Sequence, residues 1–171
     1  DAAGRGFCLV DCFGLGPVDY SLRSKRLQSW GPLLSRFIGQ RSSLRSVFHL
    51  VSSEYAGALS EGDEQIVQIF DRAVRERRAK GLPAFEFVAV LTKCDLHAAD
   101  KVPGIVKKLG DELAARGHAP SKVLVCTSAT WGRFEGGNGL SEVLEAVDGA
   151  VGAGWDASAS WEREARPPPK E

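Results

Sequence analysis

Apolar runs of strand length alternate with amphipathic stretches along most of the chain, and this alternation limits the fold more than any other feature. The runs lie at residues 7–14, 47–51, 85–91 and 122–129. Between them, apolar residues recur at every third or fourth position, as they do on the buried face of a helix. Strands that alternate with helices in this way pair in parallel, and the helices cover both faces of the sheet. The sequence therefore predicts an α/β fold with a mainly parallel sheet.

Each expected helix has its own signals. The first begins near Pro32, which suits a first helical turn, and Gly-Leu-Pro at residues 81–83 stops the second. The third ends at Gly117. Acidic residues near the start of the second helix and basic residues near its end suit the helix dipole. The apolar positions of the helices are Leu33, Leu34, Phe37 and Ile38; Ile66, Ile69, Phe70, Ala73 and Val74; Val102, Ile105, Val106, Leu109 and Leu113; and Leu140, Val143, Leu144, Val147 and Val151.

The run at residues 85–91 leads directly into Thr92, Lys93, Cys94 and Asp95. A carboxylate at the carboxyl end of a parallel strand can accept two hydrogen bonds from guanine, a pattern that adenine cannot supply. The Lys93 stem can lie along the purine while its ammonium reaches backbone carbonyls, and the Thr92 hydroxyl can bond neighbouring backbone. The motif predicts guanine recognition by Asp95. The alternative is a strand followed by a helix, with Asp95 as the N-cap.

Two further apolar runs end in short motifs. Asp11 and Gly14 form an Asp-x-x-Gly sequence, in which the Asp can hold Mg²⁺ through water and the Gly amide can sense a γ-phosphate. Thr127, Ser128 and Ala129 end the run 122–129, and their small side chains let backbone N–H groups approach the guanine carbonyl. Each motif alone is also compatible with a strand that ends in a turn. Together, their order matches the third, fourth and fifth motifs of a small GTPase.

With these motifs, the chain resembles the EngB (YihA/YsxC) family of TRAFAC-class GTPases over residues 7–151. The family motif Asp-x-Pro-Gly-Tyr-Gly is similar to residues 11–16, and its Leu-Thr-Lys-x-Asp motif is similar to residues 91–95. The helix that follows the first of these motifs in the family is similar to the segment with Trp30, Leu33, Leu34, Phe37, Arg41 and Leu44. Later helices of the family begin with sequences similar to those at Asp63 and Gly139.

The resemblance implies a three-layer P-loop NTPase fold, similar to a small GTPase, and a GTPase switch in assembly of the large ribosomal subunit. The ligand would be GTP or GDP with Mg²⁺, and Asp11 would organise the metal. The nucleotide-binding residues would be Asp11, Gly14, Thr92, Lys93, Asp95, Thr127, Ser128 and Ala129. No catalytic residue is assigned, because Leu15 stands where many GTPases carry a water-orienting Gln. Slow hydrolysis, stimulated by a ribosomal partner, is therefore expected.

The chain departs from the family pattern in three ways. Phe13 replaces a Pro, residues 52–55 lack the family's Asp-x-Arg-His-Pro sequence, and no Gly-x-x-x-x-Gly-Lys-Ser/Thr loop occurs in the 171 residues. Without that loop the polypeptide alone should bind GTP poorly, and we expect the loop upstream. Residues 1–154 would then be a partial G domain whose truncated sheet has an exposed apolar edge, and residues 155–171 a disordered polar tail.

Two alternatives differ in function class. A chain without any phosphate-binding loop would be a pseudo-GTPase that binds protein or RNA rather than nucleotide. An unrelated doubly wound protein that carries these motifs by chance would not bind guanine nucleotides at all.

Composition adds weaker limits. The chain has 22 basic and 22 acidic residues, so it has no overall attraction for nucleic acid, although local basic residues could contact ribosomal RNA. These are Arg23, Lys25, Arg26, Arg36, Arg41 and Arg45.

The cysteines Cys8, Cys12, Cys94 and Cys126 have no zinc spacing and indicate reduced thiols of an intracellular protein, in the cytoplasm, a mitochondrion or a plastid. No apolar run is long enough to span a bilayer, so we expect no membrane association, and we expect a monomer. His49, His97 and His118 are expected to be structural or solvated.

Overall fold

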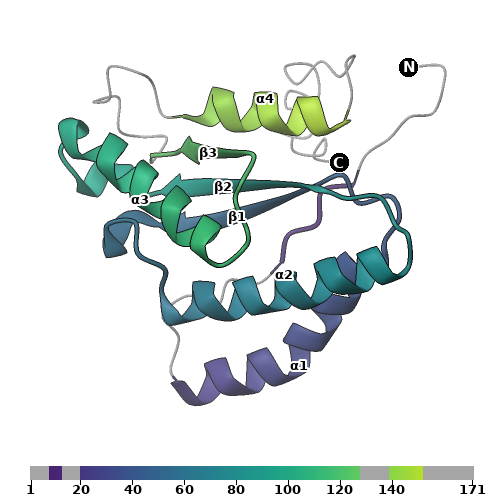
Figure 1. Ribbon diagram of the computed structural model, residues 1–171. Coiled ribbons are helices and arrows are strands. Elements are labelled where there is room, and N and C mark those ends of the chain that lie inside the picture. Colours follow the sequence, from purple (N-terminus) through teal and green to yellow (C-terminus); the bar gives the residue numbers. More distant parts are fainter. Residues whose placement is uncertain (1–7, 13–19, 128–138, 152–171) are drawn as a thin grey trace, which may run out of the picture.

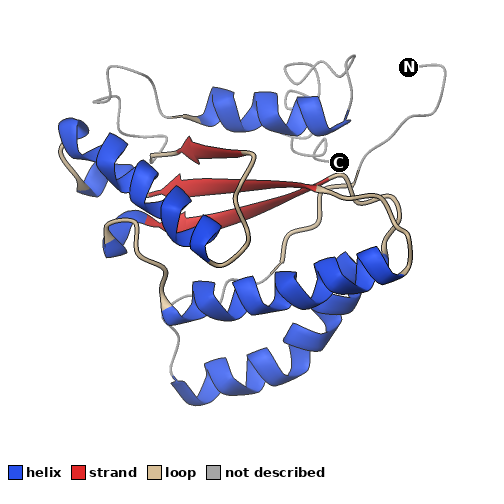
Figure 2. Ribbon diagram, viewed as in Figure 1, coloured by secondary structure: helices blue, strands red, loops and turns tan. Residues whose placement is uncertain are grey.

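The fold is seen in a computed structural model that describes residues 8–12, 20–127 and 139–151. The main elements are α1 (Tyr20–Gln40), β1 (Ser46–Ser52), α2 (Glu61–Ala79), β2 (Glu86–Thr92), α3 (Val102–Ala115), β3 (Lys122–Val125) and α4 (Leu140–Val151). Short 3-10 helices lie at η1 (Ser53–Tyr55), η2 (Cys94–Leu96) and η3 (Ala99–Lys101). Strands and helices alternate along the chain, as Figures 1 and 2 show. The predicted tail at residues 155–171 lies outside the described residues.

The described strands form one parallel sheet in the order β1-β2-β3. Ser46 lies opposite Glu86 at the start of β1, and Val88 lies opposite Lys122 at the start of β3. Each parallel pair is joined by a helical crossover, as parallel strands require. The prediction of an α/β fold with a parallel sheet is therefore confirmed.

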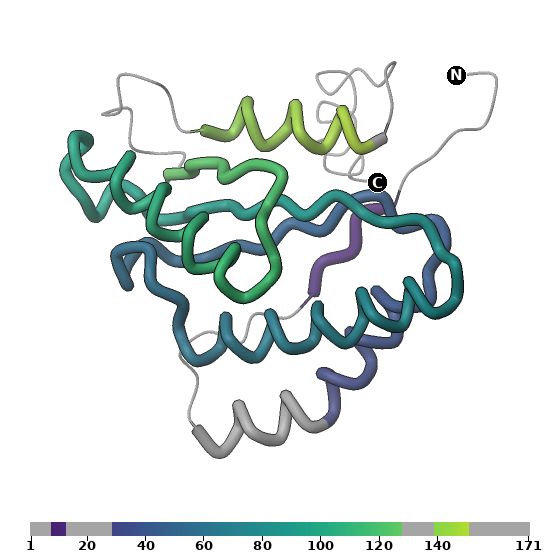
Figure 3. Tube along the Cα trace, in the orientation of Figure 1, coloured from purple at the N-terminus to yellow at the C-terminus, as the bar shows by residue number. Residues whose placement is uncertain are grey.

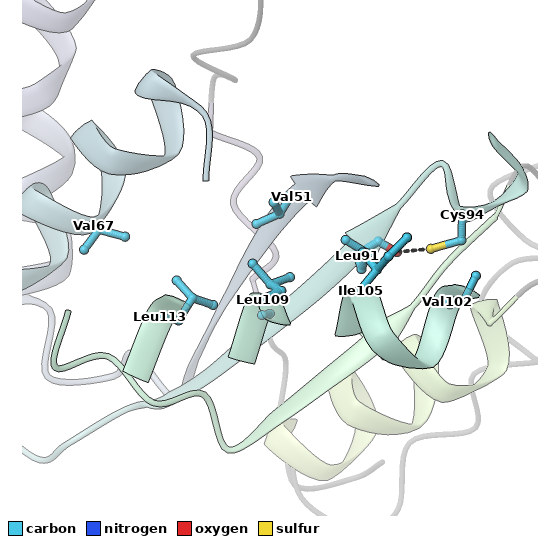
Figure 4. Close-up of a cluster of buried hydrophobic side chains, with 9 residues drawn as sticks. Val51, Val67, Leu91, Cys94, Val102, Ile105, Leu109 and Leu113 are labelled. Carbon is cyan, nitrogen blue, oxygen red and sulfur yellow. Dashed lines mark hydrogen bonds between the residues drawn. The ribbon is translucent and has the colours of Figure 1, made fainter. Parts of the chain in front are cut away.

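Helices lie on both sides of this sheet (Figure 1). One face packs against α2 and α3 in a core that includes Val51, Leu91 and Leu109, all fully buried (Figure 4). Val88 and Val90, which alternate with these positions along β2, are also buried. Leu50 on the edge strand β1 is 63% exposed. One large apolar side chain is thus exposed on this edge strand.

A second core joins α1 to α2 and to the start of the sheet. Ile38 of α1 packs with Phe70 and Ala73 of α2, and Phe85 and Phe87 extend this cluster toward β2. The helix α1 begins at Tyr20, well before the predicted start, and contains Pro32 in its interior. The prediction that Pro32 begins this helix was wrong, because packing on α2 can stabilise a helix that includes an unfavourable residue.

The predicted strand at residues 7–14 was wrong for the part that is described. Residues 8–12 have no regular secondary structure, and Leu9 and Val10 are 73% and 45% exposed. Figure 3 shows this stretch as an irregular trace. A strand requires a neighbour for its backbone hydrogen bonds, and within the described residues β1 pairs only with β2. An apolar run in the sequence does not by itself supply such a neighbour.

None of the helices in the described part of the chain is both long enough and apolar enough to cross a membrane.

Candidate functional site

The carboxyl ends of β2 and β3 bring the Thr-Lys-x-Asp motif beside Thr127, the first residue of the last predicted motif. The Cys126 N–H donates to the Leu91 carbonyl at 2.8 Å, and the Cys94 N–H donates to the Cys126 carbonyl at 3.4 Å. Thr92, Lys93 and Asp95 therefore lie beside the segment that ends in Thr127. In open parallel sheets, ligands bind outside the carboxyl ends of the strands. The geometry makes this end of the sheet the candidate site.

Lys93 has a backbone conformation that non-glycine residues seldom adopt. Its φ is 59° and its ψ is 32°, in the left-handed region. The Ser53 hydroxyl donates to the Lys93 carbonyl at 2.7 Å, and the Thr92 hydroxyl donates to the Val51 carbonyl at 3.1 Å. The expected bond from Thr92 to neighbouring backbone is thus present, and both bonds join the loop after β2 to the end of β1.

The Lys93 ammonium does not have the partners that the sequence predicted. It pairs with Glu54 Oε2 at 2.8 Å, rather than with backbone carbonyls. The hydrogen bond from Lys93 lowers the pKa of the Glu54 carboxyl, and the bond from Ser52 lowers it further. A carboxylate attracts a flexible ammonium more strongly than a neutral carbonyl does, which explains the difference.

Asp95 lies inside η2 and is half-buried. Lys93 occupies the position before η2, and Lys101 occupies the position before α3. The alternative interpretation was therefore wrong about the N-cap position of Asp95, although a strand followed by a helical turn is present as it expected.

Thr127 gives the site an unusual buried polar group. Its side chain is 8% exposed, and among the described residues its Oγ1 has no hydrogen-bond partner. Buried hydroxyls are usually hydrogen-bonded, and this one has no partner within the described part of the chain. Gly139 approaches the same strand end with φ +73°, and a Cβ there would overlap the Val125 carbonyl.

Of the remaining predicted site residues, the structure describes Asp11. Asp11 lies in the irregular segment 8–12 and is exposed. Gly14, Leu15, Ser128 and Ala129 lie outside the described residues.

A metal site is not formed by the residues at hand. Among the described residues, no group of three or more His, Cys, Asp and Glu side chains is placed to hold an ion. Asp11 alone does not make a metal site.

The three histidines have structural contacts. The His97 Nε2–H donates to the Ser53 carbonyl at 2.8 Å, since a carbonyl can only accept. His49 Nε2 forms a hydrogen bond of 3.1 Å with Asp63 Oδ1 of α2, and His118 Nε2 lies 3.3 Å from Asp71 Oδ1. Their predicted structural role is confirmed for these contacts.

Sequence reasoning did not assign Ser53 and Glu54, which contact Lys93 most closely. In the sequence, residues 52–55 differ from the family pattern, and nothing else distinguishes them. Each lies about forty positions from Lys93 along the chain, so no local signal could have found them.

In comparisons with known proteins, the sequence matches no protein-family model and no curated protein.

Proposed function

We propose that the chain is a guanine-nucleotide-binding protein of EngB type, a GTPase switch that acts in assembly of the large ribosomal subunit. Asp95 recognises the base, the Lys93 stem lies along the purine face, and the motif that begins at Thr127 supplies backbone N–H groups for the guanine carbonyl. Nucleotide enters from the carboxyl ends of β2 and β3. The ribosomal role rests on the resemblance of the motifs alone.

The observation that carries the proposal is the placement of Lys93 and Asp95 beside Thr127. Two motifs that lie more than thirty positions apart meet through the backbone bonds between Leu91, Cys94 and Cys126. The Thr127 hydroxyl, which has no hydrogen-bond partner among the described residues, adds a buried polar group at that place. A base with several donors and acceptors on one edge is a ligand of suitable chemistry.

Equilibrium titration of the full-length protein, including any sequence upstream of Asp1, tests the proposal. Fluorescent GDP and GTP should bind in the presence of Mg²⁺, and unlabelled ATP should not displace them. Binding that ATP displaces equally well would contradict guanine recognition. The absence of any binding would favour the second candidate below.

The second candidate is a pseudo-GTPase that binds protein or RNA without nucleotide. The exposed, irregular conformation of residues 8–12 favours it, because Asp11 does not end a strand, as the predicted Mg²⁺ ligand would. In this case the same scaffold would bind its partner with equal affinity in the presence and absence of GTP.

A further inference from the structure

The η1 turn is bonded to the Lys93 loop by several polar contacts. Ser53 is fully buried, and its hydroxyl donates to the Lys93 carbonyl at 2.7 Å. In the opposite direction, the His97 Nε2–H donates to the Ser53 carbonyl at 2.8 Å. Ser53 therefore holds the residue before η2 and the residue after it. Its two bonds fix both ends of the segment that contains Asp95.

The loop needs such support because of its backbone. A non-glycine residue in the left-handed region costs on the order of 1 kcal/mol or more, and persists only where surrounding contacts hold it. At Lys93 the bond to its carbonyl is a contact of this kind. Without that bond, the loop would relax toward other conformations.

Glu54 pairs with the ammonium group of Lys93. Its Oε2 accepts the Ser52 hydroxyl at 2.7 Å and the Lys93 ammonium at 2.8 Å. The ion pair is about half exposed on both sides, at 53% for Lys93 and 47% for Glu54. Ion pairs this exposed contribute little to the stability of a fold. The pair instead gives the lysine ammonium a partner on η1.

We infer that Ser53 and Glu54 are positioning residues for guanine recognition, a role that rests on the proposed function. Ser53 keeps the Lys93 backbone in its left-handed conformation, and Glu54 keeps the Lys93 stem extended where the purine face would lie. Neither needs to touch the nucleotide. Because both residues order Lys93 before the nucleotide binds, less conformational entropy is lost on binding, and the affinity for the guanine base is higher.

The Glu54→Gln substitution tests this role in the full-length protein. Titration with GDP should show affinity weakened by about two- to tenfold, the effect of freeing one long side chain. The melting temperature should stay unchanged, since the pair is exposed. Glu54→Asp, which keeps the charge, should restore part of the affinity.

The matched control is Asp111→Asn, which breaks the exposed Lys107–Asp111 pair in α3, at 2.6 Å. It should change neither affinity nor melting temperature. If wild-type protein fails to bind GDP, the proposed function is wrong and this inference falls with it. If the wild type binds GDP but Glu54→Gln binds equally well or more tightly, the inference alone is wrong.

Hydrogen exchange gives a readout that does not require nucleotide. In Ser53→Ala, the backbone amides of Leu96 and His97 should exchange roughly fivefold faster or more, because one hydrogen bond that orders the loop is lost. Amides in α3 near Asp111 should exchange as before. Unchanged exchange at Leu96 and His97 would show that Ser53 does not hold the loop.

Discussion

The two ends of the sheet each hold a cation from a neighbouring segment, and the two cations are held very differently. At the amino-terminal end, Arg77 is 3% exposed and donates to the carbonyls of Ile38 and Arg41, both at 2.8 Å. It also donates to the Pro83 carbonyl. At the carboxyl-terminal end, Lys93 is about half exposed and pairs with one carboxylate.

The two cations differ in how much they contribute to the stability of the fold. Arg77 satisfies carbonyls at the end of α1 and in the turn before β2, and burial lowers the pKa of its guanidinium. Its polar capacity is used within the fold. Lys93 and Thr127 instead keep polar groups that contribute little to the fold. The amino-terminal end stabilises the domain, and the carboxyl-terminal end is the part suited to a ligand.

Arg77→Leu should produce the largest loss of stability. The substitution leaves the buried Ile38 carbonyl and the partly buried carbonyls of Arg41 and Pro83 without this donor, and we expect a loss of about 3 kcal/mol in the free energy of unfolding. Urea denaturation of the variant measures it. The control is Arg78→Leu on the exposed side of the same helix turn, which should cost less than about 0.5 kcal/mol. Equal losses for the two variants would remove the distinction between the ends of the sheet.

Gly57→Ala should disturb the carboxyl-terminal end next most strongly. Gly57 follows η1 with φ +82°, and a Cβ there would lie 2.6 Å from the Ile105 carbonyl of α3. We expect a loss of about 2 kcal/mol in the free energy of unfolding, measured by thermal unfolding. Gly104→Ala in α3 is the control, because its Cβ would meet open space. That variant should be stabilised by about 0.5–1 kcal/mol. An unchanged free energy of unfolding in Gly57→Ala would mean that the turn after η1 does not pack against α3.

Substitution of Asp63 should have the smallest effect on the free energy of unfolding, and this effect should depend on pH. Burial opposes ionisation of its carboxyl, but hydrogen bonds from His49 and Ser60 outweigh burial and lower its pKa below the ordinary 3.8. Asp63 also completes the capping box that begins α2 at Ser60. A lowered pKa contributes stability above the unfolded-state value, and this contribution is lost as the pH falls through the folded-state value.

Asp63→Asn should therefore cost about 1 kcal/mol at pH 7, and the difference from wild type should shrink below about pH 4. Melting temperatures measured from pH 7 to pH 3 follow this change. The remote substitution Asp111→Asn should give no such difference at any pH. A difference for Asp63→Asn that persists unchanged at pH 3 would contradict the assignment.

The sequence predicted the regular part of the fold well because its signals there are local. Strands β1, β2 and β3 and helices α2, α3 and α4 follow apolar spacing, and their alternation predicted parallel pairing. The errors arose where the outcome depends on distant partners. The apolar run 7–14 predicted a strand, but a strand also needs a neighbour, which the run itself does not indicate.

Arg77 illustrates a further limit. Its place near the end of α2 indicated a favourable interaction with the helix dipole, whereas the structure shows a buried donor to distant carbonyls. A signal was present, because Arg77 lies four positions after the buried Ala73 and so faces the core. The contact between Glu54 and Lys93 had no comparable signal. Long-range polar pairs require the fold before they can be recognised.

A change of base specificity would show whether Asp95 binds the guanine base. Asn in place of Asp95 offers a donor where the carboxylate accepted, and xanthine carries a carbonyl where guanine carries its 2-amino group. In the full-length protein, Asp95→Asn should lose GDP affinity by about tenfold or more and gain affinity for xanthosine diphosphate. This gain cannot come from unfolding. GDP affinity that is unchanged in Asp95→Asn would contradict the claim that Asp95 reads the guanine base.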